Sequence, residues 1–130
     1  MSSWESATGR ILPAAQWYAA KGWKLLPCYG IIAGRCTCGG THGEPKDVGK
    51  HPSIQEWNTR STADIETVTR WWDTSPENNI GVHCQPSGFF VIDIDPRAGG
   101  PESFEKFEAL LEGALPPTVE ALTGEYNYNG

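Results

Sequence analysis

The chain has 130 residues, of which 38% are hydrophobic, so it has enough apolar side chains for the core of one ordinary domain. Its net charge of −6 argues against a strong, passive nucleic-acid binder, because such proteins present a basic face. No run approaches the roughly 18 apolar residues of a transmembrane helix. The N-terminus also lacks the basic start and apolar run of a signal peptide, so we expect a cytoplasmic protein with reduced thiols.

The N-terminal part predicts a helix, a short strand and a long loop. Apolar residues at helical spacing predict a helix over residues 12–21, with Pro13 in its first turn and Gly22 as its stop. Residues 23–27 then predict a short strand. Residues 28–53 are rich in Gly, Cys, His and Pro and lack periodicity. We therefore expect something other than apolar burial to organise this loop.

The middle of the chain predicts a second helix and two strands. Either Ser61 or Thr62 can cap the helix, which ends before Pro76. Residues 80–82 predict a short strand. Residues 89–95 are the most strand-like run, because β-branched and aromatic side chains dominate it.

The C-terminal part predicts a third helix over residues 101–112, with Gly113 as its stop, and a further strand over residues 118–122. This order of helices and strands is an α/β or α+β layout, and we expect an α+β fold with a mixed sheet and flanking helices. We expect a single domain over residues 1–130, with the Cys/His-rich loop 28–53 inside it.

Asp93 and Asp95 are the candidate catalytic residues. Residues two apart in a strand point to the same side, with backbones about 7 Å apart. Two such carboxylates can share Mg²⁺ or Mn²⁺, and two ions about 4 Å apart orient an attacking hydroxyl and stabilise a leaving phosphate. The pair therefore predicts the metal-dependent chemistry of polymerases and nucleases. The alternative is a strand end with solvated turn residues.

A series of short motifs runs in a fixed order through most of the chain. They are Ala15 to Pro27, Gly49-Lys50-His51-Pro52, Ile65 to Trp72, Asn79-Ile80-Gly81, Ser87-Gly88, Val91 to Asp95, and Leu115-Pro116-Pro117-Thr118. No single motif is specific. Taken together over residues 11–123, the series resembles the N-terminal domain of bifunctional DNA primase/polymerases (prim-pol), of the archaeo-eukaryotic primase superfamily.

The resemblance implies a primase-like fold and template-directed nucleotide addition in DNA replication, with nucleoside triphosphates and a DNA template as partners. Asp93 and Asp95 correspond to the family's first catalytic motif, so they would be ligands of Mg²⁺ or Mn²⁺. Lys50 would be a nucleotide-binding residue that contacts phosphate, as a cation on a loop near the site. The alternative for Lys50 is a solvated loop lysine.

The family continues with a second motif, a small-residue turn followed by His, and with a third acidic motif further on. The second motif follows the Leu-Thr that corresponds here to Leu122-Thr123, but this sequence has no His after His83. We therefore expect a partial prim-pol fold, either a natural short form, a truncated gene or half of a composite protein. Such a domain could be inactive alone.

The loop predicts a zinc site, because thiolate and imidazole are the ligands that zinc prefers and four of them make a closed structural site. The predicted ligands are Cys36, Cys38, His42 and His51. Some prim-pol relatives carry a Cys-rich insertion ahead of Gly-Lys-His-Pro, and this loop is similar to it. Cys28 could replace either His, and a mobile loop with reduced thiols is the alternative. His83 and Cys84 are predicted to be packing residues.

Three functions are therefore compatible with the sequence. The first is prim-pol nucleotidyl transfer through the acidic pair. The second is a non-catalytic, zinc-bearing module that binds a helicase or the remainder of a split primase. The third is a metal-dependent nuclease that uses the same acidic pair. We expect no membrane partner.

Overall fold

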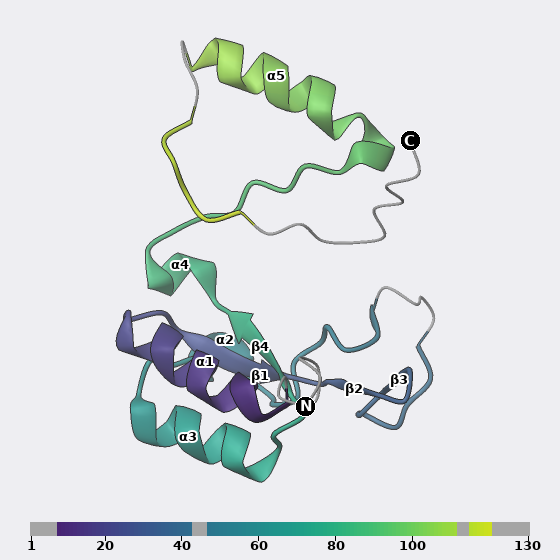
Figure 1. Ribbon diagram of the computed structural model, residues 1–130, viewed down its shortest axis with the longest axis vertical. Coiled ribbons are helices and arrows are strands. Elements are labelled where there is room, and N and C mark those ends of the chain that lie inside the picture. The colour runs from purple at the N-terminus through teal and green to yellow at the C-terminus, as the bar shows by residue number, and fades with distance from the viewer. Residues whose placement is uncertain (1–7, 43–46, 112–114, 121–130) are drawn as a thin grey trace. The chain divides into compact units, whose positions relative to one another are not determined.

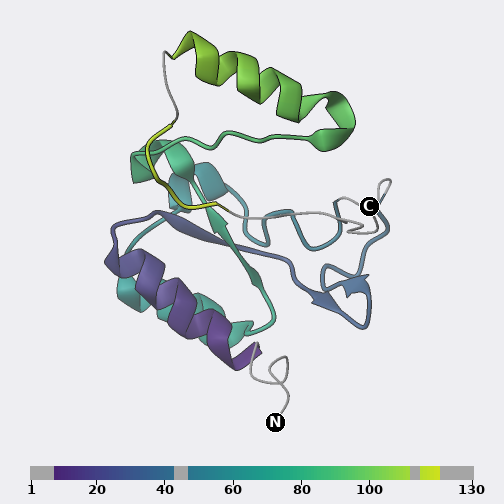
Figure 2. The same ribbon diagram turned by 45° about the horizontal axis from the view of Figure 1, so that its top comes forward.

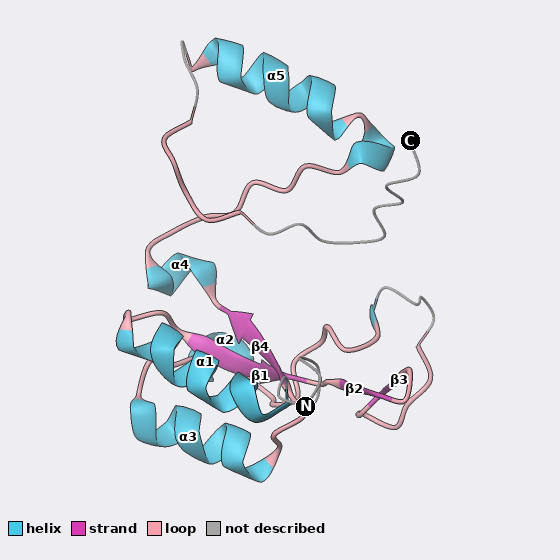
Figure 3. Cartoon of the chain, viewed as in Figure 1, coloured by secondary structure: helices cyan, strands magenta, loops and turns pink. Residues whose placement is uncertain are grey.

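The computed structural model describes residues 8–42, 47–111 and 115–120 (Figure 1). The chain divides into two units, Met1–Val91 and Ile92–Gly130. The first unit contains α1 (Thr8–Ala20), β1 (Leu25–Cys28), β2 (Ile31–Ile32), β3 (Arg35–Cys36), α2 (Trp57–Arg60), α3 (Ile65–Thr74), β4 (Asn79–Val82) and α4 (Cys84–Ser87). The second unit contains the 3₁₀ helix η2 (Pro96–Ala98) and α5 (Gly100–Leu110). This mixture of helices and antiparallel strands confirms the α+β class (Figure 3).

The strands of the first unit form two small antiparallel sheets, β1 with β4 and β2 with β3. In the larger sheet, Leu25 lies opposite Val82 and Cys28 lies opposite Asn79. The Pro27 carbonyl points away from β4, since it accepts from the Ser53 N–H at 3.0 Å. The backbone N–H and C=O of one strand residue point to the same side, so the N–H that Pro27 lacks would not have bonded to β4, and β1 tolerates the proline. The predicted strands at 23–27 and 80–82 are therefore confirmed, with slightly shifted ends. In the described residues, antiparallel sheets take the place of the expected mixed sheet.

Helices α1 and α3 lie side by side on one face of the β1–β4 sheet (Figures 1 and 2). Their small and aromatic side chains meet in the core of the unit. The buried core residues are Ala15, Ala19, Leu25, Val68 and Trp72. A two-stranded sheet alone is marginal in water, so this helical layer is what stabilises the β1–β4 ladder.

Helix α1 begins earlier than the sequence predicted. It starts at Thr8, so Pro13 lies inside the helix and not in its first turn. A proline there removes one backbone hydrogen bond, which the helix tolerates because its inner face is packed against α3. Gly22 is the predicted stop: it adopts a left-handed φ of 87° and its N–H donates to Ala19 O at 2.9 Å.

Helix α3 is capped by Asp64, so the predicted Ser61 or Thr62 cap is wrong. Asp64 Oδ2 accepts from the Thr67 backbone N–H at 3.0 Å and from the Thr67 hydroxyl at 2.7 Å. These two hydrogen bonds lower the pKa of Asp64, with the hydroxyl contributing most. Thr62 instead exchanges backbone hydrogen bonds with Leu25, so it is held beside β1 and is not free to cap.

The strand predicted over residues 89–95 is wrong: this run belongs to no helix or strand. Most of its apolar side chains are exposed: Phe90 is 79% exposed and Val91 is 68% exposed. Phe89, in contrast, packs against the ring of Trp23. High β-propensity reflects a fit to a paired, half-buried surface, and none of the described strands pairs with this run. The strand predicted over 118–122 is absent from its described part, 118–120, and the rest lies outside the described residues.

The second unit begins with the turn that follows the acidic pair. Gly99 has a φ of 72°, and a Cβ at Gly100 would collide with the backbone of Asp95. Glycine at these two positions therefore allows the chain to fold back over Asp95 and enter α5. The third predicted helix is confirmed by α5, while its predicted stop at Gly113 lies outside the described residues. Among the described helices, none is long and apolar enough to cross a membrane.

Trp72 supplies the first test of this fold. Its side chain is 1% exposed and its indole Nε1–H donates to Asn78 O at 2.9 Å, which ties α3 to the start of β4. Trp72→Phe leaves that buried carbonyl without its donor, and we expect a loss of about 1–3 kcal/mol in the free energy of unfolding. Urea denaturation measures this loss. The control is Trp71→Phe, since Trp71 is only partly buried and should change stability much less.

Candidate metal centre and acidic pair

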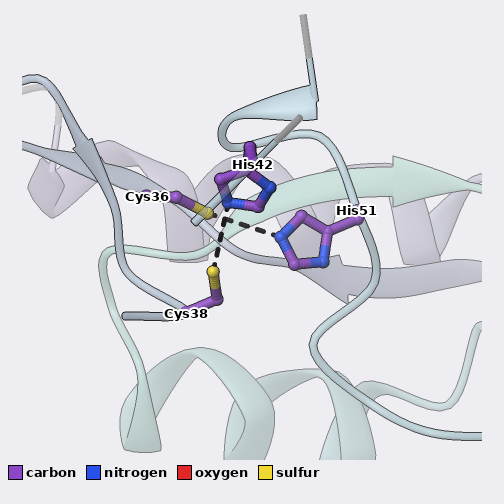
Figure 4. Close-up of side chains that lie close together, drawn as sticks. All are labelled: Cys36, Cys38, His42 and His51. Carbon is purple, nitrogen blue, oxygen red and sulfur yellow. Dashed lines mark hydrogen bonds between the residues drawn. The ribbon is translucent and has the colours of Figure 1, made fainter. Parts of the chain in front are cut away.

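The four predicted zinc ligands come together in the first unit. Their ligand atoms all lie within 4.8 Å of one another (Figure 4). Cys36 Sγ is 3.5 Å from His51 Nε2, and Cys38 Sγ is 3.2 Å from His42 Nε2. These side chains are buried or half-buried, so a clustered set of two thiols and two imidazoles is enclosed by the loop.

A tight hairpin places the two cysteines. Strands β2 and β3 pair Ile31 with Cys36 and Ile32 with Arg35. The two turn residues, Ala33 and Gly34, have φ of 51° and 75°, the left-handed pair that a two-residue hairpin needs. Cys36 therefore leaves the hairpin at its end, and Cys38 follows two residues later.

His51 reaches the cluster from the other end of the loop. The Tyr29 backbone N–H donates to His51 O at 3.0 Å, and Cys28 bridges to Pro52. The ring of Tyr29 also lies 4.8 Å from the His51 ring. The continuation of β1 thus holds one end of the loop against the sheet, with His51 beside the cysteines.

The surroundings of Cys36 favour its thiolate form. Burial works against its charged form, but hydrogen bonds from the backbone N–H groups of Cys38 and Gly49 and from the side chains of Cys38 and His51 outweigh it. Together they lower the pKa of Cys36 from 9.0 to about 6. A thiolate is the form that binds metal, so this environment prepares Cys36 as a ligand.

The donor set fits a structural zinc site. Zinc bonds of about 2.0–2.3 Å in a tetrahedron need ligand atoms roughly 3.3–3.8 Å apart. The Cys38–His42 and Cys36–His51 pairs, at 3.2 and 3.5 Å, are near that spacing already, and separations approaching the 4.8 Å limit need a small inward movement. The cluster can therefore hold a metal ion such as zinc.

The other two cysteines lie outside the cluster. Cys28 sits on β1 and is buried, and burial raises the pKa of its thiol. Its Sγ packs against Gly81, where a Cβ would meet it at 2.9 Å, so Cys28 does not replace either His in the cluster. Cys84 begins α4 and its Sγ donates weakly to Val82 O at 3.6 Å.

Asn79 helps to hold the Cys/His loop in place, a role that the sequence did not reveal. Its side-chain amide donates to Gly49 O at 2.8 Å and to Tyr29 O at 3.3 Å. It therefore ties the far end of the loop to β4 next to His51. The sequence showed Asn79 as part of a motif, but its partner lies 30 residues away along the chain, so no local pattern could expose this role.

Lys50 lies between Gly49 and His51. Its side chain is exposed, and its backbone N–H donates to Asp47 O at 3.3 Å. Gly49 has a φ of 69°, and its N–H donates to Cys36 Sγ at 3.4 Å. Of the two chain neighbours of Lys50, Gly49 is therefore hydrogen-bonded to the Cys/His cluster and His51 is a member of it.

The acidic pair belongs to the second unit. Asp93 is exposed, while Asp95 is 44% exposed and caps η2. Asp95 Oδ1 accepts from the Arg97 backbone N–H at 2.9 Å and from Arg97 Nε at 3.4 Å. These contacts, the backbone bond first, lower the pKa of Asp95. In the parts of the chain that the structure describes, neither Asp belongs to a group of three or more potential metal ligands.

The sequence of the chain matches the profile of one known protein family. The sequence profile of the family described as bifunctional DNA primase/polymerase, N-terminal, matches residues 15–128. The chain belongs to this prim-pol family. No curated protein and no solved structure matches it. The matched range includes both the Cys/His loop and the acidic pair, so the two candidate sites lie within one prim-pol domain sequence.

Zinc retention tests the cluster in this prim-pol domain. The purified protein should retain one zinc ion per chain after dialysis, and Cys36→Ser should lose it. Removing even an outer-shell partner weakens metal binding about 10–100-fold, so loss of a thiolate ligand should lower the affinity at least as much. Metal analysis by mass spectrometry measures the content. Cys84→Ser is the matched control and should keep its zinc; equal loss from both variants would refute the assigned ligands.

The ionisation of Cys36 gives a second test, on the metal-free protein. Its pKa is lowered to about 6 from 9.0, so any stability that the thiolate contributes is fully present above pH 9.0 and is lost as the pH falls toward 6. The ultraviolet absorbance of the thiolate during an acid titration reports this change. The difference between the parent and Cys36→Ser should have its midpoint near pH 6. A midpoint near the ordinary value would mean that the hydrogen bonds to Sγ are absent in solution.

Proposed function

We propose that this prim-pol domain serves template-directed nucleotidyl transfer, with divalent cations held by Asp93 and Asp95 and with zinc in the Cys/His cluster. The observation that carries the proposal is the family match over residues 15–128, which includes all of these side chains. Nucleoside triphosphates and a DNA template are the proposed partners. Mg²⁺ or Mn²⁺ supplies the charge that orients an attacking hydroxyl and stabilises the leaving phosphate.

The acidic pair has free oxygen ligands to offer. Asp93 is exposed, and among the described residues Asp95 uses only Oδ1, for its bonds to Arg97. Asp95 Oδ2 can therefore ligate a cation while Oδ1 keeps the turn closed. The lowered pKa of Asp95 supports this role, because a carboxyl must be ionised to bind Mg²⁺ or Mn²⁺.

Zinc and Lys50 act together in this proposal. Gly49 donates to Cys36 Sγ and His51 is a cluster ligand, so a metal ion in the cluster fixes the backbone on both sides of Lys50. The exposed ammonium group of Lys50 is then presented to a nucleotide phosphate as a cation on a fixed loop. Zinc thus has a structural role, and Lys50 has the role of contacting the nucleotide.

A second candidate function rests on the surface of the β2–β3 hairpin. Ile31 and Ile32 are 53% and 58% exposed beside the Cys/His cluster. Neighbouring exposed aliphatic side chains favour contact with another protein, such as a helicase or the remainder of a split primase. In that case the domain is a non-catalytic, zinc-bearing module, and its acidic pair is dispensable.

Calorimetric titration of a deoxynucleoside triphosphate with Mn²⁺ tests the main proposal. The parent should bind, whereas Asp93→Asn/Asp95→Asn should show no Mn²⁺-dependent binding, because the two carboxylates that hold the cation are gone. The amide oxygen that replaces the Asp95 carboxylate can still accept from Arg97 N–H, so the turn should persist in the variant. Lys50→Gln should weaken nucleotide binding about tenfold, the effect of losing one charged hydrogen bond.

Two control variants make the same Asp→Asn and Lys→Gln changes at exposed positions outside the proposed site. Asp73→Asn and Lys106→Gln alter exposed residues of α3 and α5 and should bind like the parent. Failure of a folded, zinc-loaded parent to bind nucleotide would overturn the catalytic proposal and favour the partner-binding module. Degradation of DNA without added nucleotide would instead identify a nuclease.

A further inference from the structure

A pocket lined mostly by polar residues lies at the end of the β1–β4 sheet opposite to the Cys/His cluster. Its volume is about 370 Å³, which is within the range of small-molecule sites. One lysine, one histidine, neutral polar side chains and a proline line it, and none of the lining residues is acidic. The lining residues used below are Lys24, Ser61 and His83.

The backbone holds Lys24 and His83 together. The register of β1 with β4 ends at Leu25 opposite Val82, so Lys24 and His83 form the next cross-strand pair. His83 N–H donates to Lys24 O at 2.8 Å. The Ser87 hydroxyl bridges the two backbones, since Oγ accepts from Lys24 N–H at 2.8 Å and donates to His83 O at 2.6 Å. Directly opposite residues of an antiparallel pair point to the same face, so both side chains face the pocket.

The ring of His83 is oriented by its neighbours. Its Nδ1 is 2.8 Å from Ser61 Oγ, and the ring lies edge-on to Trp57 with centroids 5.1 Å apart. When the Ser61 hydroxyl donates to Nδ1, the other nitrogen, Nε2, carries the proton. Nε2 makes no hydrogen bond within the described residues, so it is a donor without a protein partner.

The charge of the pocket differs from that of the chain. The whole protein carries a net charge of −6. Across residues 8–42, 47–111 and 115–120, the sole ion pair joins Asp95 to Arg97, so no described carboxylate neutralises Lys24. The ammonium group of a half-buried lysine, an N–H donor and neutral amide and hydroxyl groups are the chemistry that recognises a phosphate group.

We propose that this pocket binds a phosphate group, with Lys24 Nζ and His83 Nε2 donating to its oxygens and Ser61 holding the His83 ring in place. The phosphate belongs either to a free nucleotide or to a nucleic-acid strand, a choice of sources that rests on the proposed function. The site needs neither the acidic pair nor Mg²⁺ or Mn²⁺. It gives an acidic protein a local contact for a polyanion.

Nuclear magnetic resonance of the imidazole groups tests this proposal directly. The sequence has three histidines, so His83→Gln assigns the His83 signals by their disappearance. The zinc-loaded, full-length protein is titrated without Mg²⁺ or Mn²⁺, in separate arms, with inorganic phosphate, a deoxynucleoside triphosphate and a 5′-phosphorylated oligothymidylate. We expect the His83 signals to shift in every arm that binds and those of His42 to stay, whereas a shift confined to His51 would report phosphate at the neighbouring Lys50. The arm with the tighter binding identifies the source of the phosphate.

Matched variants separate a built site from general charge attraction. Lys24→Gln should weaken binding of the better probe by about tenfold, the effect of losing one charged hydrogen bond. Lys24→Arg should retain most of it. Lys21→Gln makes the same charge change on a lysine that lies over the Trp17 ring, outside the pocket, and should bind like the parent.

Three results would overturn the proposal. They are equal weakening by Lys21→Gln and Lys24→Gln, shifts at His42 or His51 in place of His83, and no shift with any probe. Thermal unfolding of each variant confirms that it is folded, and Lys24→Met, which also removes the charge, replaces Lys24→Gln if the latter is not. Because Mg²⁺ and Mn²⁺ are absent, failure here is distinct from failure of the Mn²⁺-dependent titration that tests the acidic pair.

Discussion

The antiparallel register of β1 with β4 positions both candidate sites of the first unit. At one end of the ladder, Cys28 lies opposite Asn79, and the chain continues into the loop that holds the Cys/His cluster. At the other end, Lys24 and His83 meet beside Ser61. A slip of one residue would exchange the faces of every side chain on the ladder, so both sites would be lost together. The packing of α1 and α3 on one face of the sheet excludes such a slip, because Leu25 must stay in the core.

The sequence predicted those features that depend on local patterns. The helical spacing around α1, α3 and α5 and the strand character around β1 and β4 were recognisable because each is encoded within a few neighbouring residues. The Cys/His ligands were predictable for a similar reason, since three of the four occur within seven residues. Excluding Cys28 as a substitute for either His needed the structure, which shows Cys28 packed against Gly81.

The features that sequence reasoning missed depend on distant partners. Ser61 and Thr62 are good capping residues, but backbone pairing with Leu25 engages Thr62, so Asp64 caps α3. Residues 89–95 have strong β-propensity, yet strand formation also requires a partner, which composition does not encode. The Lys24 and His83 pair joins residues far apart in the sequence, and only the strand register reveals it.

The anchoring of His51 has a consequence for how the domain acquires its metal. The Tyr29 N–H and the Tyr29 ring hold His51, and the Asn79 side chain holds Gly49, so these contacts come from the protein's own groups. In the described residues, Cys38 and His42 instead bond to other residues of the loop: to each other, to the Gly40 N–H and, for Cys38, to Cys36. One half of the cluster is therefore preformed on the sheet, and the other half lies on the outer part of the loop. A metal ion that binds this cluster would then add to a loop whose inner end the protein already holds, and would contribute most to the order of its outer end.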